Sequence, residues 1–233
     1  MDIHAGTSGY SYKEWLGVFY PDKLAAAKML GFYAGQLPAV EINNTFYRMP
    51  KPNVLENWRA QVPESFRFAI KASRRITHNK KLADADGEVE FLTGNLESLG
   101  DTFGALLFQL PPFLRKGAER LQKFIDILPD GLPAAFEFRH ASWFDDEIGD
   151  MLAERNFAWV ISENADGETP ERISTADWGY LRLRREDYDS AMLRGWHDRI
   201  AGQDWSRVFV FFKHEDDGAG PALARRFLDL EQG

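Results

Sequence analysis

The chain has 233 residues, of which 44% are apolar and 14% aromatic, carries a formal net charge of −8 and contains no cysteine. This composition is sufficient for one large hydrophobic core, excludes disulfides and thiolate metal sites, and argues against non-specific binding to nucleic acid or anionic lipid, which both require a basic surface. The sequence contains no run of about eighteen apolar residues and does not begin with a basic region followed by an apolar one, so we expect a cytoplasmic protein that makes no contact with membranes.

Alternating apolar and polar residues predict eight short strands. Val40 and Ile42, for example, alternate with Glu41 and Asn43, which is the period of a strand with one buried face. Short polar residues follow this segment and end the strand, and two prolines further along prevent the next helix from starting early. The predicted strands are 3–8, 39–43, 67–71, 105–110, 134–139, 157–162, 180–184 and 208–213.

Most of these strands are separated by segments with helical periodicity. Leu121, Phe124, Ile125 and Leu128, for example, recur with a period near 3.6 residues. The predicted helices are 23–36, 52–61, 89–99, 118–128, 148–156, 192–201 and 222–230, and the polar segment 164–177 is the weakest helix candidate.

Eight strand–helix units of this length predict a single α/β domain over residues 1–233, folded as an eight-stranded parallel (β/α) barrel that is TIM-barrel-like. The alternative is an open, doubly wound sheet. A glycine-rich dinucleotide fingerprint would favour that alternative. The sequence contains none, because its GTSG segment lacks both the third glycine and a helix directly after it.

The alternation also predicts which residues point into the barrel. Apolar residues such as Leu106 and Phe108 must pack beneath the helices, so the residues between them face inward. Only the strand 157–162 is ambiguous; at the C-terminal ends of the other strands the rule places polar residues inward. This inward set comprises Ser8, Glu41, Asn43, Lys71, Gln109, Glu137, Arg139, Arg182, Arg184 and Lys213.

The C-terminal ends of the strands are also where barrels of this type carry their active sites. One interpretation of the inward charges is a set of buried ion pairs, such as Glu137 with Arg139 or Arg182, that closes the top of the core. Because buried charges are costly to desolvate and contribute little net stability, we favour a solvent-filled, functional mouth.

Six sequence blocks carry a resemblance to a known family. In chain order they are GTSGYSYKEWLGVFYP, VEINNTFYRMP, FAIKASRRITH, LLFQLPP, FEFRHASW and FVFFKHE. Together they resemble the YecE-like family, a domain of unknown function, over nearly the whole chain. The resemblance implies an α/β barrel similar to TIM barrels and no established activity. The sequence departs from one common family pattern in its last two strands, where RLRRED and FKHE replace an expected His-Gly pair and paired asparagines.

Two inward glutamates are candidates for catalysis. Glu41 and Glu137 end strands that lie three apart, and barrel geometry allows their carboxyl groups to approach to about 5–8 Å. Carboxyl pairs at such separations perform the acid–base chemistry of glycoside hydrolysis. The alternative is that one or both glutamates neutralise Lys71 or Arg139.

Several cations gather at the same end of the barrel. Arginine grips phosphate or carboxylate through its planar fork and lysine adds a point charge, so we expect Lys71, Arg139 and Arg182 to hold an anion. The alternative is simple pairing with neighbouring glutamates. Asn43 and Gln109 would position the ligand. Further possible members of the site are His140, Lys213 and His214.

Aromatic residues follow the same strands. We expect Tyr12, Trp15, Tyr47 and Trp143 to border one pocket and to stack on a ring of the ligand. The alternative is that they only cap the barrel. We expect neither a metal nor a cofactor, because the histidines lack close ligand spacings such as HxH or HExxH.

These observations favour an enzyme that performs acid–base, hydrolytic chemistry on a small substrate bearing a phosphate or carboxylate. One alternative is a non-catalytic barrel that binds nucleic acid, which the net charge of −8 disfavours. Another is a barrel that senses a small ligand. The sequence leaves open the substrate, the oligomeric state and whether the protein is an enzyme at all.

Overall fold

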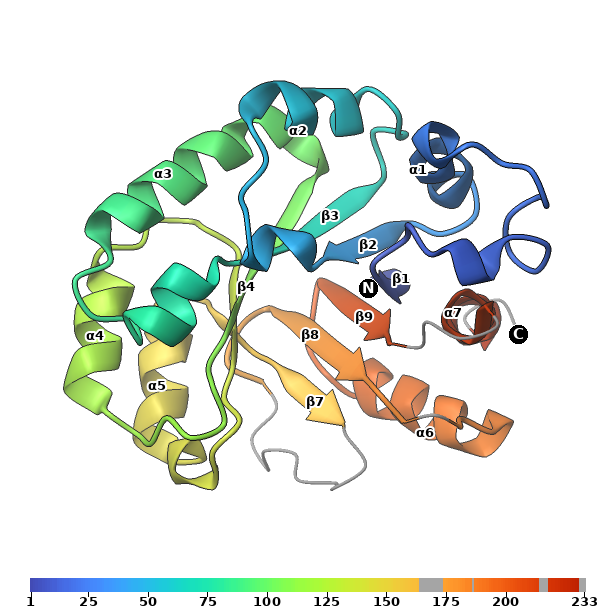
Figure 1. The fold of residues 1–233 in the computed structure, drawn as a ribbon. Coiled ribbons are helices and arrows are strands. Elements are labelled where there is room, and N and C mark those ends of the chain that lie inside the picture. Colours follow the sequence, from blue (N-terminus) through green and yellow to red (C-terminus); the bar gives the residue numbers. More distant parts are fainter. Residues whose placement is uncertain (164–173, 186, 214–217, 231–233) are drawn as a thin grey trace.

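The computed structural model describes residues 1–163, 174–185, 187–213 and 218–230. Within these ranges, nine parallel strands form a nearly closed barrel with helices packed around its outside (Figure 1). The strands are β1 Asp2–Ser8, β2 Ala39–Ile42, β3 Arg67–Lys71, β4 Phe103–Gln109, β5 Ala134–Glu137, β6 Ala158–Trp159, β7 Ile161–Glu163, β8 Trp178–Leu183 and β9 Arg207–Phe212. Their order in the sheet is β6-β5-β4-β3-β2-β1-β9-β8-β7.

The predicted strand 157–162 is two short strands, so the expected count of eight is wrong. β6 pairs with β5 and β7 pairs with β8, and only Val160 separates them. The Val160 N–H donates to the carbonyl of Phe136 at 2.9 Å. One short segment thus pairs with one neighbour through its first half and with the other through its second half. The architecture remains TIM-barrel-like.

Helices connect most of the strands. They are α1 Ala26–Ala34, α2 Pro52–Arg59, α3 Asp86–Leu96, α4 Ala118–Asp126, α5 Asp146–Glu154, α6 Ser190–Ala201 and α7 Ala219–Asp229. The short helical turns are η1 Lys13–Trp15, η2 Asn44–Phe46, η3 Arg75–Asn79, η4 Glu97–Thr102 and η5 Ala141–Trp143. Aspartates cap α5 and α6, where Asp145 and Asp189 accept N–H groups of the first turn. Most of the segment 164–177 lies outside the described residues.

No helix in the described ranges combines the length and the apolar character that crossing a membrane requires. The longest, α6, has 12 residues, well short of the roughly 20 that span a bilayer.

The core has two layers, as the alternation predicts. The outward residues of the strands, such as Val40, Phe68 and Leu106, pack beneath the helices. The inward residues form a separate cluster inside the barrel. On the β2–β6 wall most of these are alanines, whereas β8 and β9 contribute large rings, among them Tyr180 and Phe211. Rings from one wall thus fill the space that alanines leave at the other.

The inward residues at the C-terminal ends of the strands are polar, and they lie directly above this apolar filling. The alternation of apolar and polar residues therefore predicts correctly that these polar side chains point inward at the C-terminal ends of the strands. The residues that begin this layer are Ser8, Glu41, Lys71, Gln109, Glu137 and Arg182.

Candidate functional site

A buried ion cluster forms the floor of the mouth. It consists of Glu41, Glu137 and Arg182, here named the Arg182 cluster, and their side chains are 0%, 1% and 2% exposed. Arg182 donates to Glu41 through Nε at 2.8 Å and Nη2 at 2.7 Å, and to Glu137 through Nη1 at 2.6 Å. The three residues come from β2, β5 and β8, so the cluster joins separate parts of the barrel wall.

Glu41 has no free acceptor position facing solvent. Besides Arg182, its oxygens accept from Ser8 Oγ at 2.8 Å, Asn43 Nδ2 at 3.0 Å and Tyr180 Oη at 2.7 Å. Burial raises the pKa of Glu41, but the adjacent Arg182 and the hydrogen bonds outweigh it and lower the pKa to about 2. A buried carboxylate with this pKa does not suit the acid–base role predicted for Glu41.

Glu137 is held in a similar way. Gln109 Nε2 donates to both of its oxygens at 2.9 Å, and Arg182 occupies one of them as well. For these three charged residues the buried ion-pair interpretation is correct and the expected solvent-filled site is not. The predicted pairing of a glutamate with Lys71 or Arg139 is also absent from the described contacts.

Lys71 differs from the cluster below it. It ends β3, is half-buried, and donates from Nζ to Gln109 Oε1 at 2.8 Å. The ammonium lies 4.5 Å from the centroid of the Phe46 ring. Within the described residues no carboxylate oxygen lies within 4.0 Å of it. Burial, followed by the positive charge of Arg182, lowers the pKa of Lys71 to about 8.

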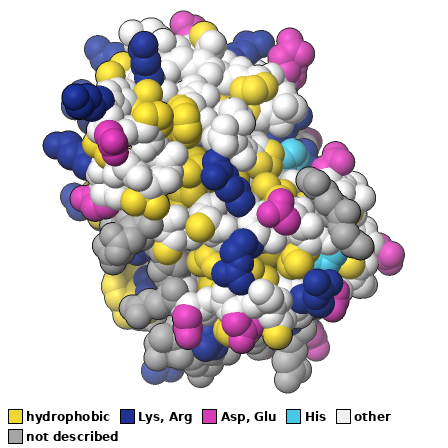
Figure 2. Space-filling model, turned by 90° about the vertical axis from the view of Figure 1, so that its right-hand side faces the viewer, with side chains coloured by type: hydrophobic (Ala, Val, Ile, Leu, Met, Phe, Trp, Pro, Cys, Tyr) yellow, Lys and Arg dark blue, Asp and Glu magenta, His cyan; other side chains and the backbone are white. Residues whose placement is uncertain are grey.

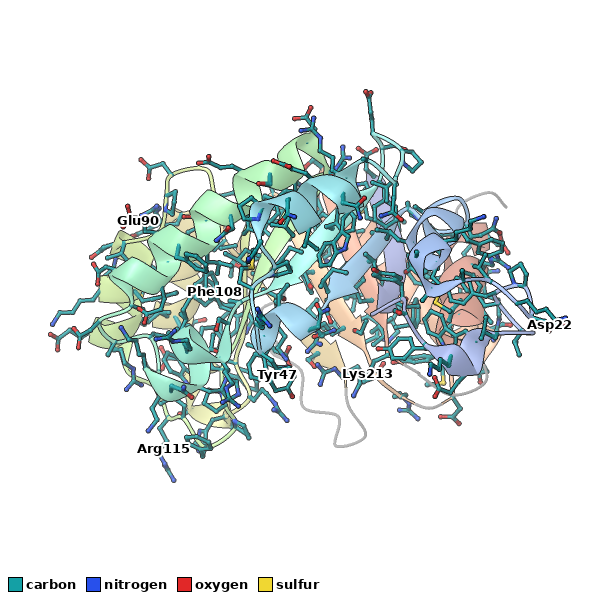
Figure 3. All side chains as sticks on the ribbon, turned by 45° about the horizontal axis from the view of Figure 1, so that its top comes forward. Asp22, Tyr47, Glu90, Phe108, Arg115 and Lys213 are labelled. Carbon is teal, nitrogen blue, oxygen red and sulfur yellow. The ribbon has the colours of Figure 1, made fainter. Side chains whose placement is uncertain are left out.

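Three further cations follow the strands at this end of the barrel. Arg139 is exposed and makes no ion pair or hydrogen bond with the described residues. Arg184 has a buried Nε without a partner, and its Nη2 is 3.9 Å from Glu137. Lys213 is exposed just beyond β9, and Figure 3 shows it at the same end of the barrel as Tyr47. Among the described residues, Arg139 and Lys213 therefore add positive charge to this end of the barrel without a carboxylate partner.

The histidines are dispersed, and one of them belongs to the mouth. His78 in η3 contacts the Phe46 ring at 4.9 Å, and burial followed by Lys71 and Arg139 lowers its pKa. His140 is half-buried and accepts the Ser142 N–H. His214 lies outside the described residues. In the described part of the chain, no three His, Asp or Glu side chains converge to hold a metal.

The aromatic residues do not border one pocket, and that prediction is wrong. Trp15 and Trp143 are both 0% exposed, and each packs in its own aromatic group of the outer core. Tyr12 lines a cavity of about 310 Å³ with Asn43. Tyr47, which is 73% exposed, lines a separate cavity of about 530 Å³. Neither tryptophan is available to stack on a ligand.

Sequence reasoning missed several partners. Tyr180 donates to Glu41 and is completely buried, and the alternation of Trp178, Tyr180 and Arg182 could have identified it as inward. Arg184 belongs to the inward set that the alternation predicts, but it is not among the residues predicted to hold the ligand. His78 follows the third strand by seven residues, so its position in the sequence allows it to reach the mouth, although no periodic signal connects it to Lys71.

Two curated proteins are similar to this chain. The UPF0759 protein YunF of Bacillus subtilis (strain 168) is 25% identical over 230 residues, which cover 91% of this chain and 78% of YunF. The UPF0759 protein YecE of Escherichia coli (strain K12) is 33% identical over 144 residues, which cover 61% of this chain and 50% of YecE. The second match thus spans half of the relative.

Solved structures share the fold over the whole chain. A DUF72 family protein from Thermotoga maritima has a TM-score of 0.88 and 25% identity, and the match covers 100% of both chains. A DUF72 family protein from Enterococcus faecalis has a TM-score of 0.79 and 19% identity, with 100% of this chain and 98% of that chain covered. The family model described as "Protein of unknown function DUF72" matches residues 4–232. The chain therefore belongs to the DUF72 family, and the YecE-like resemblance of its six sequence blocks is confirmed.

Proposed function

We propose that the C-terminal mouth of the barrel binds a small molecule bearing a phosphate or carboxylate and performs acid–base chemistry on it. The observation that carries the proposal is Lys71, a half-buried lysine without a carboxylate partner among the described residues. Uncompensated charge at the active end of a barrel favours a ligand of opposite sign.

The residues of the mouth divide into two layers. The Arg182 cluster, in which each guanidinium nitrogen donates to a carboxylate, is the rigid lower layer, and Lys71, Arg139 and Arg184 form the layer that acts on the ligand. The predicted hydrolytic role for its two glutamates loses support, because Arg182 occupies both carboxylates. Lys71, in place of the two glutamates, is the group that exchanges protons with the substrate, because an amine with a pKa of about 8 is partly neutral near physiological pH. Arg139 and Arg184 grip the anionic group.

Binding of an extended nucleic acid has less support than binding of a small anion. On the face drawn in Figure 2, Lys and Arg side chains are interspersed with Asp and Glu. The net charge of the whole chain is −8. An extended nucleic-acid site needs a continuous basic surface, whereas a small anion needs only the cations of the mouth.

The first test is a calorimetric titration with inorganic phosphate at low ionic strength. Charge-assisted hydrogen bonds contribute about 1.5–3 kcal/mol, so Arg139→Ala should weaken binding at least about tenfold. Arg194 is the matched control, since it is exposed on the outer helix α6 and its replacement by alanine should leave binding unchanged. Equal binding by the parent and Arg139→Ala would place the anion elsewhere.

The second test addresses the acid–base step. Pyruvate in heavy water is the probe, and NMR follows the replacement of its methyl protons by deuterium. The parent should accelerate this exchange, and Lys71→Met should reduce it to the rate without protein. If exchange persists in Lys71→Met, or if the parent gives none with pyruvate or with a panel of other oxo acids, the acid–base part of the proposal fails.

A further inference from the structure

The hydrogen bonds around Lys71 fix the position of its amine. Gln109 uses its amide nitrogen on Glu137, so its oxygen faces Lys71 and accepts one N–H. Gln109 is 6% exposed, which leaves its amide little freedom to turn. The Phe46 ring covers another side of the ammonium. The amine is therefore held at the strand end, with the uncharged oxygen of Gln109 as its hydrogen-bond partner among the described residues.

The charges around Lys71 act on its pKa in both directions. Two cations act on it, and two carboxylates act in the opposite direction but are already engaged by Arg182. The charged or titratable groups that face it from the surrounding elements are Glu41 on β2, His78 in η3, Glu137 on β5, Arg139 after β5 and Arg182 on β8. Burial is the largest effect and disfavours the protonated form, so a neutral amine is accessible at moderate pH.

Lys116 provides the contrast within the same chain. Its Nζ lies 2.9 Å from Asp145 and 2.7 Å from Glu147, and these carboxylates raise its pKa. A lysine paired in this way stays protonated and is a poor nucleophile. The arrangement around Lys71, by contrast, is the one in which a lysine becomes nucleophilic. It is partly buried, it has cations as neighbours, and none of the described carboxylates pairs with it.

We propose that Lys71 is a nucleophile that condenses with the carbonyl group of a small anionic aldehyde or ketone to form an imine. The inference rests on the proposed function, because Arg139 and Arg184 hold the anionic group of the same molecule. It adds the substrate class: oxo acids or phosphorylated carbonyl compounds.

The step is balanced without an oxidant or a reductant. The neutral Nζ attacks the carbonyl carbon, the carbonyl oxygen takes a proton from solvent, and Nζ loses one of its protons to solvent, which gives a neutral carbinolamine. The hydroxyl of the carbinolamine then takes a second proton and leaves as water while the freed nitrogen lone pair forms the C=N bond of a protonated imine, the iminium. The resulting iminium withdraws electrons from the adjacent carbon, which assists the proton exchange proposed above.

The experiment traps the imine on the intact protein. Glyoxylate, a small anionic aldehyde, is the probe, sodium cyanoborohydride reduces the imine to a stable amine, and peptide mass mapping locates it. A lysine with a pKa of about 8 has on the order of a hundred times more neutral amine near pH 7.5 than an ordinary lysine. Part of this advantage is lost in lower nucleophilicity, so we expect at least about tenfold more label on Lys71 than on Lys116.

Four comparisons make the result specific. Acetaldehyde lacks the anionic group and should label Lys71 more slowly than glyoxylate. Inorganic phosphate should compete with glyoxylate, and Arg139→Ala should remove the preference for the anionic probe. The labelling rate in the parent should rise with pH with a midpoint near 8. These measurements need no Lys71 variant, so they do not depend on whether such a variant folds.

The outcomes separate this inference from the proposed function. If phosphate binds through Arg139 but glyoxylate labels Lys71 no faster than Lys116, the imine is excluded and the anion site stands. If neither phosphate binding nor labelling is found, both proposals fail. Label concentrated on Lys71 without competition by phosphate supports the nucleophile and overturns the shared anion site.

Discussion

Arg182 is a buried charged residue at the boundary between the apolar interior of the barrel and its polar mouth. Its guanidinium lies directly above the rings that fill the interior, and two carboxylates compensate its charge. Such a group adds little net stability, because desolvation offsets most of the attraction, but removing one partner is costly. The cluster therefore makes the mouth sensitive to single substitutions that leave packing unchanged.

Glu137→Gln tests this sensitivity. The substitution keeps the shape of the side chain but leaves buried Arg182 with Glu41 as its remaining carboxylate. Removing one partner of a buried pair costs roughly 3–5 kcal/mol, so we expect the free energy of unfolding in urea to fall by about 3 kcal/mol. Arg194→Ala should change it by less than about 0.5 kcal/mol. A loss for Glu137→Gln below about 1 kcal/mol would mean that water screens the cluster.

His4, at the opposite end of the barrel, predicts a pH dependence. Its Nδ1 is buried and has no partner among the described residues, and its ring stacks on Phe209 at 5.1 Å. Burial, followed by the charge of Arg67, lowers the pKa of His4 from 6.5 to about 4. Between these values the unfolded chain binds a proton that the folded chain does not, so the free energy of unfolding falls as pH decreases through this window.

The variant His4→Phe should remove about 2 kcal/mol of that decrease. The free energy of unfolding in urea is measured for the parent and the variant at about pH 7 and about pH 4.5. The decrease between the two pH values is then compared for the two proteins. An equal decrease in both proteins would show that other groups cause the acid sensitivity.

At the scale of elements, β1 and β2 approach so closely that one position excludes any side chain. Gly6 pairs with Ala39, and a Cβ at Gly6 would lie 1.9 Å from the Ala39 carbonyl oxygen. Gly195 lies in α6 and has no atom within 4 Å of the corresponding position. Gly6→Ala should therefore destabilise the fold by about 3 kcal/mol or more, whereas Gly195→Ala should stabilise it by about 0.5–1 kcal/mol.

Thermal and urea unfolding of the two glycine variants measure these changes with the same chemical substitution. The opposite signs matter more than the magnitudes. If Gly6→Ala unfolds like the parent, the pairing of β1 with β2 must be looser than the register indicates.

The elements also show what the sequence could and could not predict. Alternation predicts the inward and outward faces of β2, β4 and β5 correctly, because a strand has a fixed period of two residues. It fails at residues 157–162, where both faces are buried and the pattern is continuously apolar. The break at Val160 depends on where the two ends of the sheet meet, which no local pattern encodes.

The sequence predicts which residues share the layer at the mouth, but not which of them pair with one another. The alternation places Glu41, Lys71 and Arg182 in one layer, and the structure agrees. Which carboxylate reaches which cation depends on distances across the barrel, so the burial of Glu41 and Glu137 could not be inferred from their strands. The burial of Trp15 and Trp143 likewise depends on how their loops fold back onto the outer core.

At the scale of the whole molecule, we expect unfolding to be a single cooperative transition. The strands share one sheet, and the Arg182 cluster ties together β2, β5 and β8, so no described segment has a core of its own. Far-UV circular dichroism and the fluorescence of the seven tryptophans should give coincident urea transitions. Two separated transitions would contradict a single domain.

The place of β1 in the sheet has a consequence for synthesis. β1 lies between β2 and β9, and it pairs with β9 along six residues, Asp2–Thr7 with Arg207–Phe212. A ribosome makes β1 before every other strand of the sheet and β9 after all of them. Until β9 is made, the nascent chain therefore holds β1 with one edge unpaired, and such an edge is a template for wrong pairing with other chains. Completion of the barrel must wait until the ribosome has released the sixth residue of β9, so this fold closes only after all the other strands have been made.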